Sequence, residues 1–134
     1  GKTIGIIGLG NVGKRFAQIC NALGLKVLIL SKTFDAIKNE FPEYMSCDLN
    51  NILKEADIIS FHCKPNLDGS PIISAKEIAI MKNNVLIINT ARGNLVSEID
   101  LNHAIKNNTI GGVALDVFEE EPAKNNILFG LDNV

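Results

Sequence analysis

The chain has no strong excess of charge of either sign, and it has no long apolar run. Its 134 residues carry 13 Lys and Arg against 15 Asp and Glu, a formal net charge of −2. Such a balance gives no electrostatic footprint for nucleic acid or an anionic membrane surface. No apolar stretch approaches the roughly 20 residues that span a bilayer. No signal peptide precedes the first apolar segment, although the chain begins at Gly1 and not at a methionine.

Cysteines are few and are not arranged as a disulfide framework or a metal site. Cys20, Cys47 and Cys63 are odd in number and lack metal-ligand spacing. Such residues are typical of reduced thiols that fill cores in cytosolic proteins. The sequence therefore predicts a cytoplasmic protein with no metal, no membrane and no nucleic-acid partner.

Short apolar segments alternate with helical patterns along the whole chain. The composition, 46% hydrophobic and 21% charged, is typical of one soluble globular domain spanning 1–134. Apolar runs predict strands, and periodic or capped segments predict helices between them. We expect strands over 4–7, 26–30, 44–47, 56–61, 85–89 and 110–117, with the start of another at 131–134. The predicted fold is α/β, a Rossmann-type doubly wound parallel sheet with helices on both faces.

Two of the predicted helices carry specific signals. Ser74 with Glu77 forms a capping box for a helix that we expect to run to about Met81. The helix that follows Ser97 has Ile99, Ala104 and Ile105 as candidates for inward-facing residues. Further short helices are expected over 36–41 and 49–55, the latter capped by Asp48.

Three glycines follow the first predicted strand in the spacing G-x-G-x-x-G. Gly8 would allow a tight turn, Gly10 close approach of the backbone to phosphates, and Gly13 close packing of helix on strand. Val12, Phe16, Ile19 and Leu23 recur at helical spacing, so a helix begins inside the motif. Its free N–H groups and positive dipole end would face an anion. The motif, with Asn11 and Val12 inside it, therefore predicts a dinucleotide site.

Four stretches together resemble the nucleotide-binding domain of the D-isomer-specific 2-hydroxyacid dehydrogenases. They are 8–13, 57–62, 74–93 (ending Ile-Ile-Asn-Thr-Ala-Arg-Gly) and 112–122 (Gly-Val-Ala-Leu-Asp-Val-Phe-Glu-Glu-Glu-Pro). The resemblance covers essentially the whole chain. It implies hydride transfer between NAD(H) or NADP(H) and C2 of a small 2-hydroxy or 2-oxo acid, and it implies a homodimer.

The resemblance also assigns catalytic roles. It matches Arg92 to the arginine that holds the substrate carboxylate and carbonyl, a role suited to the planar fork of a guanidinium. The alternative is a surface arginine in an ion pair. Glu121 matches the glutamate that hydrogen-bonds the catalytic histidine and raises its pKa. Glu119 and Glu120 are read as solvated neighbours in an acidic loop.

Further matches concern the cofactor and the missing histidine. Asp116 matches the residue that contacts the nicotinamide carboxamide, while Thr90, Ala91 and Cys63 match other cofactor contacts. The family's catalytic histidine lies beyond an Asn-Val pair, where this chain ends. His62 and His103 are read as structural instead. The resemblance thus implies a cofactor domain excised from a larger two-domain enzyme, inactive by itself.

The chain departs from the family at the end of the second strand. Ser31 stands where an acidic residue normally binds the ribose hydroxyls, and Lys32 follows it. A hydroxyl beside a cation favours a 2′-phosphate, so we expect relaxed or NADP-leaning cofactor choice. Alternatively, Ser31 still bonds the ribose, or Asp35 replaces the missing acid. A second departure, Lys64 before Pro65, leaves a lysine that could reach the adenosine or simply be solvated.

Two other function classes come into consideration. Transcriptional corepressors resemble the same family, so a nucleotide-sensing regulatory protein is the alternative to an enzyme. A short-chain dehydrogenase would need a Tyr-x-x-x-Lys pair. The only tyrosine, Tyr44, is followed by Met-Ser-Cys-Asp, which excludes that class.

Overall fold

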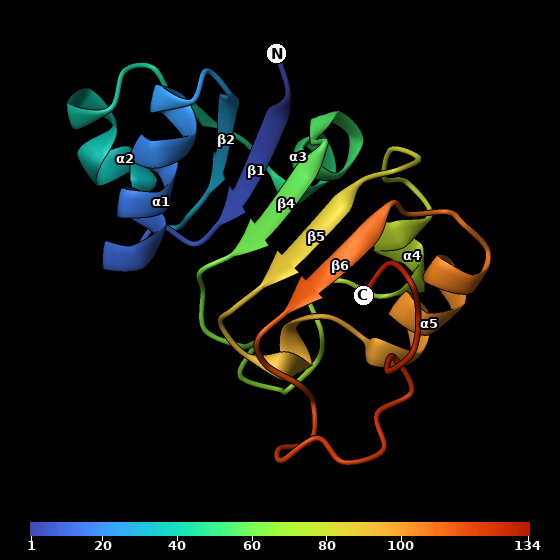
Figure 1. Cartoon of the computed structure of the whole chain (residues 1–134). Helices are drawn as coiled ribbons and strands as arrows, with labels where there is room; N and C mark the ends of the chain where they lie inside the picture. The colour runs from blue at the N-terminus through green and yellow to red at the C-terminus, as the bar shows by residue number, and fades with distance from the viewer.

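A six-stranded parallel sheet forms the centre of the molecule (Figure 1). The computed structural model describes residues 1–134. The strand order is β3-β2-β1-β4-β5-β6, so the direction of winding reverses between β1 and β4. This order confirms the predicted doubly wound Rossmann-type sheet. The strands are β1 (Thr3–Ile7), β2 (Lys26–Leu30), β3 (Met45–Ser46), β4 (Ile58–Phe61), β5 (Leu86–Asn89) and β6 (Gly112–Leu115).

Helices pack on both faces of the sheet. They are α1 (Asn11–Ala22), α2 (Phe34–Ile37), α3 (Leu49–Glu55), α4 (Ala75–Ile78) and α5 (Glu98–Lys106), with 3-10 turns at Lys38–Glu40 and Gly93–Leu95. Side chains of β1 alternate between the two layers: Ile4 and Ile6 join the core under α1, while Ile7 joins the larger core under α3, α4 and α5. None of the helices is both long and apolar enough to cross a membrane.

Small residues form the face of α1 that packs on the sheet. Gly13, Ala17 and Cys20 are the buried residues of this helix. The larger apolar residues at helical spacing lie beside that face, with Val12 68%, Ile19 48% and Leu23 73% exposed. The helix was predicted correctly, but of the four larger apolar residues at helical spacing only Phe16 packs against the core, and it is half-buried. Small side chains allow the close approach of helix to strand that the glycine turn demands.

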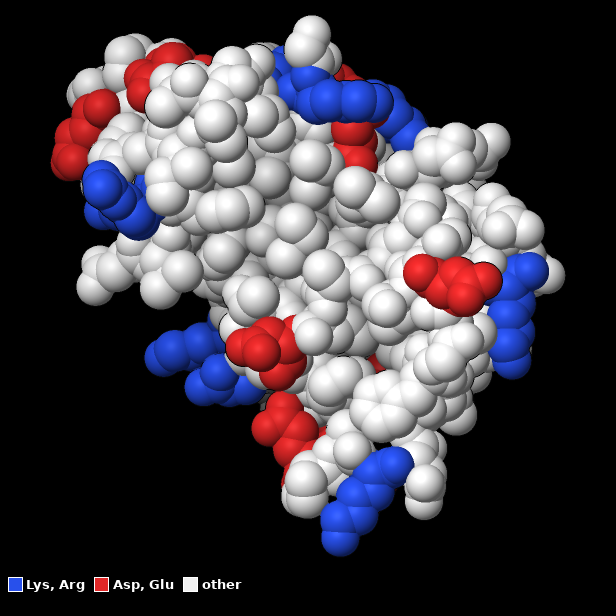
Figure 2. Space-filling model, viewed as in Figure 1, with Lys and Arg blue, Asp and Glu red and all other residues white.

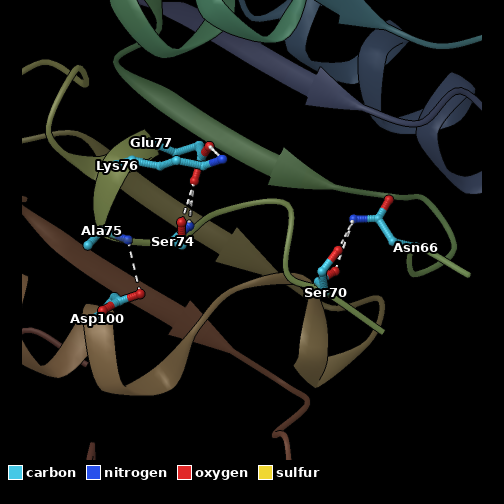
Figure 3. Close-up of polar contacts among 7 residues, drawn as sticks. All are labelled: Asn66, Ser70, Ser74, Ala75, Lys76, Glu77 and Asp100. Carbon is cyan, nitrogen blue, oxygen red and sulfur yellow. Dashed lines mark hydrogen bonds and ion pairs between the residues drawn. The ribbon is translucent and has the colours of Figure 1, made fainter. Parts of the chain in front are cut away.

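Polar contacts that include the predicted capping box fix the start of α4 (Figure 3). The backbone N–H and hydroxyl of Ser74 both donate to Glu77 Oε2, at 2.9 and 2.6 Å. The N–H of Ala75 donates to Asp100 Oδ2 at 3.0 Å, which ties α4 to α5. The capping box is therefore confirmed. The helix itself ends at Ile78 rather than near Met81.

Three other expectations need correction. The last strand ends at Leu115, since its ladder with β5 stops at Asn89, and Asp116 lies just beyond it. Ile99 is 61% exposed on the outer side of α5, whereas Ala104 and Ile105 are buried as expected. Residues 131–134 form a turn and not a strand, although one hydrogen bond joins them to β6.

One face of β4, β5 and β6 carries no helix (Figure 1). Leu86 on this face is 45% exposed, and Ala114 of the neighbouring strand is exposed as well. The same view in Figure 2 shows the centre of this face largely free of charged side chains. The half of the sheet on the α5 side is thus covered on one face only.

Candidate dinucleotide and substrate site

The glycine turn between β1 and α1 is shaped by two of its three glycines. Gly8 has φ +98°, a left-handed conformation that suits glycine, and a Cβ atom there would collide with the backbone of His62 and Cys63. A Cβ atom at Gly13 would collide with the carbonyl oxygen of Gly8. The fold itself therefore requires glycine at both positions.

Gly10 differs, because nothing in the protein requires it to be glycine. Its φ of −74° is open to any residue, and a Cβ atom there would meet no protein atom within 4 Å. As the N-cap of α1 it supplies no side chain to the first N–H groups of the helix. This uncapped, open helix start fits the pyrophosphate of a dinucleotide, which needs backbone donors and close approach.

A hollow of about 300 Å³ opens beside this turn, at the carboxyl ends of β4 and β5. It brings together five of the predicted site residues, Val12, Cys63, Thr90, Ala91 and Arg92. Lys64 also lines it, with Phe61, His62 and Pro65. A larger hollow of about 560 Å³ lies between α5 and the loop after β6. The smaller one is the better candidate, because parallel sheets bind ligands at their carboxyl ends where the winding reverses.

Asn89 holds the loop that carries Arg92. Its buried side chain accepts from the N–H of Ala91 at 3.1 Å and donates to the carbonyl of Arg92 at 2.8 Å. The Arg92 side chain is exposed and makes no ion pair; its Nη1 donates to the carbonyl of Ala91 at 2.6 Å. The alternative of a surface ion pair therefore does not apply. This loop-holding role of Asn89 was not predicted from the sequence, although a polar residue at the end of an apolar strand can indicate one.

Asp116 and Glu121 lie outside the hollow, on the segment after β6. The N–H of Asp116 donates to the carbonyl of Asn89 at 3.0 Å, so this segment starts beside the Arg92 loop. Glu121 is exposed, and its Oε1 accepts from the N–H of Phe118 at 3.1 Å within its own turn. The structure thus places the two predicted catalytic residues on adjacent loops.

Ser31 and Lys32 lie at the end of β2, next to the glycine turn. The N–H of Gly8 donates to the carbonyl of Leu30 at 2.8 Å, which fixes this neighbourhood. Ser31 Oγ lies 3.1 Å from Thr33 Oγ1 and accepts from the N–H of Thr33 at 3.3 Å. Lys32 is exposed and makes no ion pair. The end of β2 therefore offers hydroxyl groups and a cation, with no carboxylate at position 31.

His62 has the contacts of a packing residue. Its Nε2 lies 2.9 Å from Ser60 Oγ, and its ring lies 5.1 Å from that of Phe16 on α1. Burial lowers the pKa of His62 below its ordinary value, which favours the neutral ring. Burial likewise raises the pKa of the Cys63 thiol, so this cysteine is not an activated nucleophile. His103 is exposed on α5, away from the hollow.

Comparison with known proteins adds independent information. The sequence profile of the "D-isomer specific 2-hydroxyacid dehydrogenase, NAD binding domain" matches residues 1–134. D-3-phosphoglycerate dehydrogenase of Methanocaldococcus jannaschii is 41% identical over 139 residues, which cover 100% of the chain and 26% of that protein. The chain spans less than half the length of the curated relatives it matches.

Two solved structures are similar in sequence as well as in fold. D-lactate dehydrogenase with NAD⁺ from Lactobacillus jensenii is 38% identical, with a TM-score of 0.82 over 89% of this chain and 36% of that one. An acyclic imino acid reductase in complex with NADPH and D-Arg is also 38% identical. Its TM-score is 0.87 over 99% of this chain and 41% of that one.

Proposed function

Because this chain belongs to the D-isomer specific 2-hydroxyacid dehydrogenase family, as an NAD-binding domain, we propose that it serves an oxidoreductase acting on D-2-hydroxy acids. The proposed reaction is hydride transfer between a nicotinamide cofactor and C2 of a small 2-hydroxy or 2-oxo acid. We further propose that the domain works within a larger enzyme, whose remaining parts supply a proton-transfer histidine and a second wall of the cleft. This proposal is supported by the greater length of the relatives, of which the chain covers 26% and 40%.

The open surroundings of Gly10 are the main observation in support of the proposal. Gly8 and Gly13 are explained by the fold alone, whereas Gly10 has no packing or conformational reason to be glycine. Close approach of a ligand to the backbone is the reason that remains, and the uncapped start of α1 suits an anionic one. Gly8, Gly10, Asn11, Val12 and Gly13 would then surround the pyrophosphate.

The chain's own residues would then bind and orient the reactants. The bound nicotinamide would supply or accept the hydride. Arg92, whose guanidinium has one hydrogen bond to its own loop, would hold the carboxylate and carbonyl oxygens of the substrate. Glu121 would orient the histidine and stabilise its charged form. Thr90, Ala91, Cys63 and Asp116 would flank the nicotinamide.

Steady-state assays of the complete enzyme test this function. A panel of 2-oxo acids is offered with NADH and with NADPH, and turnover of at least one acid is expected. Arg92→Lys should raise KM and lower kcat, because a point charge does not reproduce the two parallel donors of a guanidinium. Dinucleotide binding without turnover of any acid would favour the alternative, a nucleotide-sensing regulatory protein.

The residues at the end of β2 bear on the choice between NAD(H) and NADP(H). We propose that NADP(H) is accepted at least as well as NAD(H), because Ser31 and Lys32 replace a carboxylate that would repel a 2′-phosphate. Both cofactors occur among similar proteins, NAD⁺ with the lactate dehydrogenase and NADPH with the imino acid reductase.

For the assembly, we propose a homodimer that uses the exposed apolar stripe of α1. Ile19 of this helix and Leu23 at its C-cap are 48% and 73% exposed, and burying such residues would stabilise a dimer. Sedimentation of wild type and of Ile19→Glu/Leu23→Glu is the test, with a monomer expected for the double variant. The three free cysteines suit a cytoplasmic location.

A further inference from the structure

Two loops at the carboxyl ends of the strands touch through Gly93. This glycine directly follows Arg92, and a Cβ atom there would collide with the carbonyl group of Phe118. Phe118 belongs to the segment that leads to Glu121. The backbones of the Arg92 loop and of the Glu121 loop (116–122) are therefore in close contact, and each loop limits the position of the other.

A reciprocal pair of hydrogen bonds anchors the Glu121 loop to the start of α5. The N–H of Glu98 donates to Glu119 Oε1 at 2.8 Å, and the N–H of Glu119 donates to Glu98 Oε1 at 2.7 Å. Each carboxylate thus binds the backbone of the other residue and not its carboxylate. Glu119 is exposed, as predicted for a solvated neighbour of Glu121, and its carboxylate is also part of this anchor.

The second carboxylate oxygen of Glu98 accepts from Asn126, which follows the Glu121 loop in the chain. Asn126 Nδ2 donates to Glu98 Oε2 at 2.7 Å, and Asn126 Oδ1 accepts from the N–H of Leu128 at 2.9 Å. Glu98 is only 8% exposed, and Leu128 is fully buried. A buried carboxylate whose two oxygens face two donors is fixed in position, because losing either partner leaves a buried charge unsatisfied.

We propose that Glu98 and Glu119 are positioning residues that keep Glu121 in register with Arg92. Glu121 is exposed, and its own side chain bonds only to Phe118 in the same turn, so its distance from Arg92 depends on how the loop is anchored. Arg92 and the histidine that Glu121 orients must act on one substrate, and small errors in their separation are costly in rate. This inference rests on the proposed dehydrogenase function.

The chemistry of the anchor predicts an asymmetry between two conservative variants. Glu98 accepts from two donors with two oxygens, so Glu98→Gln places an amide N–H₂ against a donor. Glu119 uses one oxygen to accept from one N–H, and Glu119→Gln keeps that acceptor. Glu119→Ala removes it. Glu120→Gln is the matched control, because Glu120 is exposed in the same loop and has no hydrogen bond in the structure.

Amide hydrogen exchange, followed by NMR on the 134-residue chain, measures how well the anchor protects its N–H groups, independently of catalysis. In Glu98→Gln the new amide N–H₂ faces one of the two donors, so exchange should be at least about tenfold faster at the N–H of Glu119 or at that of Leu128, which Asn126 holds. Exchange at the N–H of Glu98 should be faster in Glu119→Ala and nearly unchanged in Glu119→Gln. All these rates should match wild type in Glu120→Gln.

Steady-state kinetics of the complete enzyme measure how the anchor affects catalysis. In Glu98→Gln and Glu119→Ala, kcat for 2-oxo acid reduction should fall about tenfold or more, while the Kd for the reduced cofactor stays constant. The basic limb of the pH profile should move to lower pH, because a misplaced Glu121 no longer raises the pKa of its histidine partner. A role in stability alone would lower the melting temperature without moving that limb.

The outcomes separate the two proposals. Normal kcat and an unshifted pH profile in Glu98→Gln, with wild type active, would overturn the positioning role and leave the proposed function intact. Loss of activity in Glu119→Gln equal to that in Glu119→Ala would also overturn it, because the backbone acceptor would then not be what matters. A wild-type enzyme that turns over no 2-oxo acid overturns the dehydrogenase function itself, and the positioning role with it.

Discussion

Replacing Ser31 with aspartate is the most direct test of cofactor choice. The side chain lies at the end of β2, beside the glycine turn, where the adenosine ribose should lie if Gly10 faces the pyrophosphate. In wild type the Ser31 and Thr33 hydroxyls lie 3.1 Å apart, and Lys32 has no anionic partner. We expect Kd values for NADPH and NADH within tenfold of each other, or in favour of NADPH.

The expected effect of Ser31→Asp has two parts. Two unit charges about 5 Å apart in water repel by roughly 0.8 kcal/mol, and the nearly doubly charged 2′-phosphate gives about 1.5 kcal/mol against NADPH. A carboxylate that accepts from the ribose hydroxyls adds about 1.5 kcal/mol in favour of NADH, the low end for charged hydrogen bonds. The ratio Kd(NADPH)/Kd(NADH) should therefore rise about tenfold to hundredfold, the lower value allowing for exposure to solvent.

Calorimetric titration of both reduced cofactors, at two salt concentrations, measures these constants. The wild-type affinity for NADPH should fall more steeply with salt than that for NADH, since Lys32 acts through screened charge. Asp35→Asn is the matched control for the alternative ribose partner, and it should leave both constants unchanged. The reasoning is refuted if wild type prefers NADH by more than about tenfold, a difference of ~1.4 kcal/mol.

Three further predictions follow from the site. Gly10→Val should abolish dinucleotide binding in calorimetry and lower the melting temperature only slightly, because valine is a poorer N-cap than glycine. Gly13→Val should lower it much more, because its side chain meets the Gly8 carbonyl. Unchanged affinity in Gly10→Val would place the ligand elsewhere. The 134-residue chain should show no turnover of 2-oxo acids, since the proposed roles of Arg92 and Glu121 need a proton-transfer histidine from the rest of the proposed larger enzyme; robust turnover would overturn these roles. The half-buried His62 has a pKa lowered by desolvation, so the unfolded state binds its proton more tightly. Stability should thus fall as pH drops from about 7 through the unfolded pKa of roughly 6.5. Thermal melts at pH 7.5 and 5.5 should show a smaller difference in His62→Asn, and an equal difference would refute this explanation.

Most strands, the glycine turn and most helix starts could be predicted from the sequence. These features depend on local rules: apolar runs for β1 and β5, glycine spacing for the turn, and the Ser74 and Glu77 pair for α4. Because the predicted strands are parallel, their carboxyl ends meet at one edge of the sheet. The position of Arg92 directly after a strand therefore predicted its place on the crevice side, where it lines the hollow together with Val12.

Which face of α1 packs on the sheet depended on the tertiary structure. Spacing predicted Val12, Phe16, Ile19 and Leu23 as the apolar stripe, but only Phe16 of these packs against the core, because the sheet contacts the small residues beside them. The three glycines already had different predicted roles, and their neighbours agree with them. Backbone contacts require glycine at positions 8 and 13, whereas Gly10 is open to a ligand.

The anchor of the Glu121 loop could not be predicted from the sequence. Glu98 and Glu119 are 21 residues apart, and each bonds to the other's backbone N–H, a group that every residue but proline carries. Residue type and spacing therefore hold no signal for this pairing. It forms because the sheet brings the start of α5 and the segment after β6 to the same edge, where the buried Glu98 carboxylate must find donors.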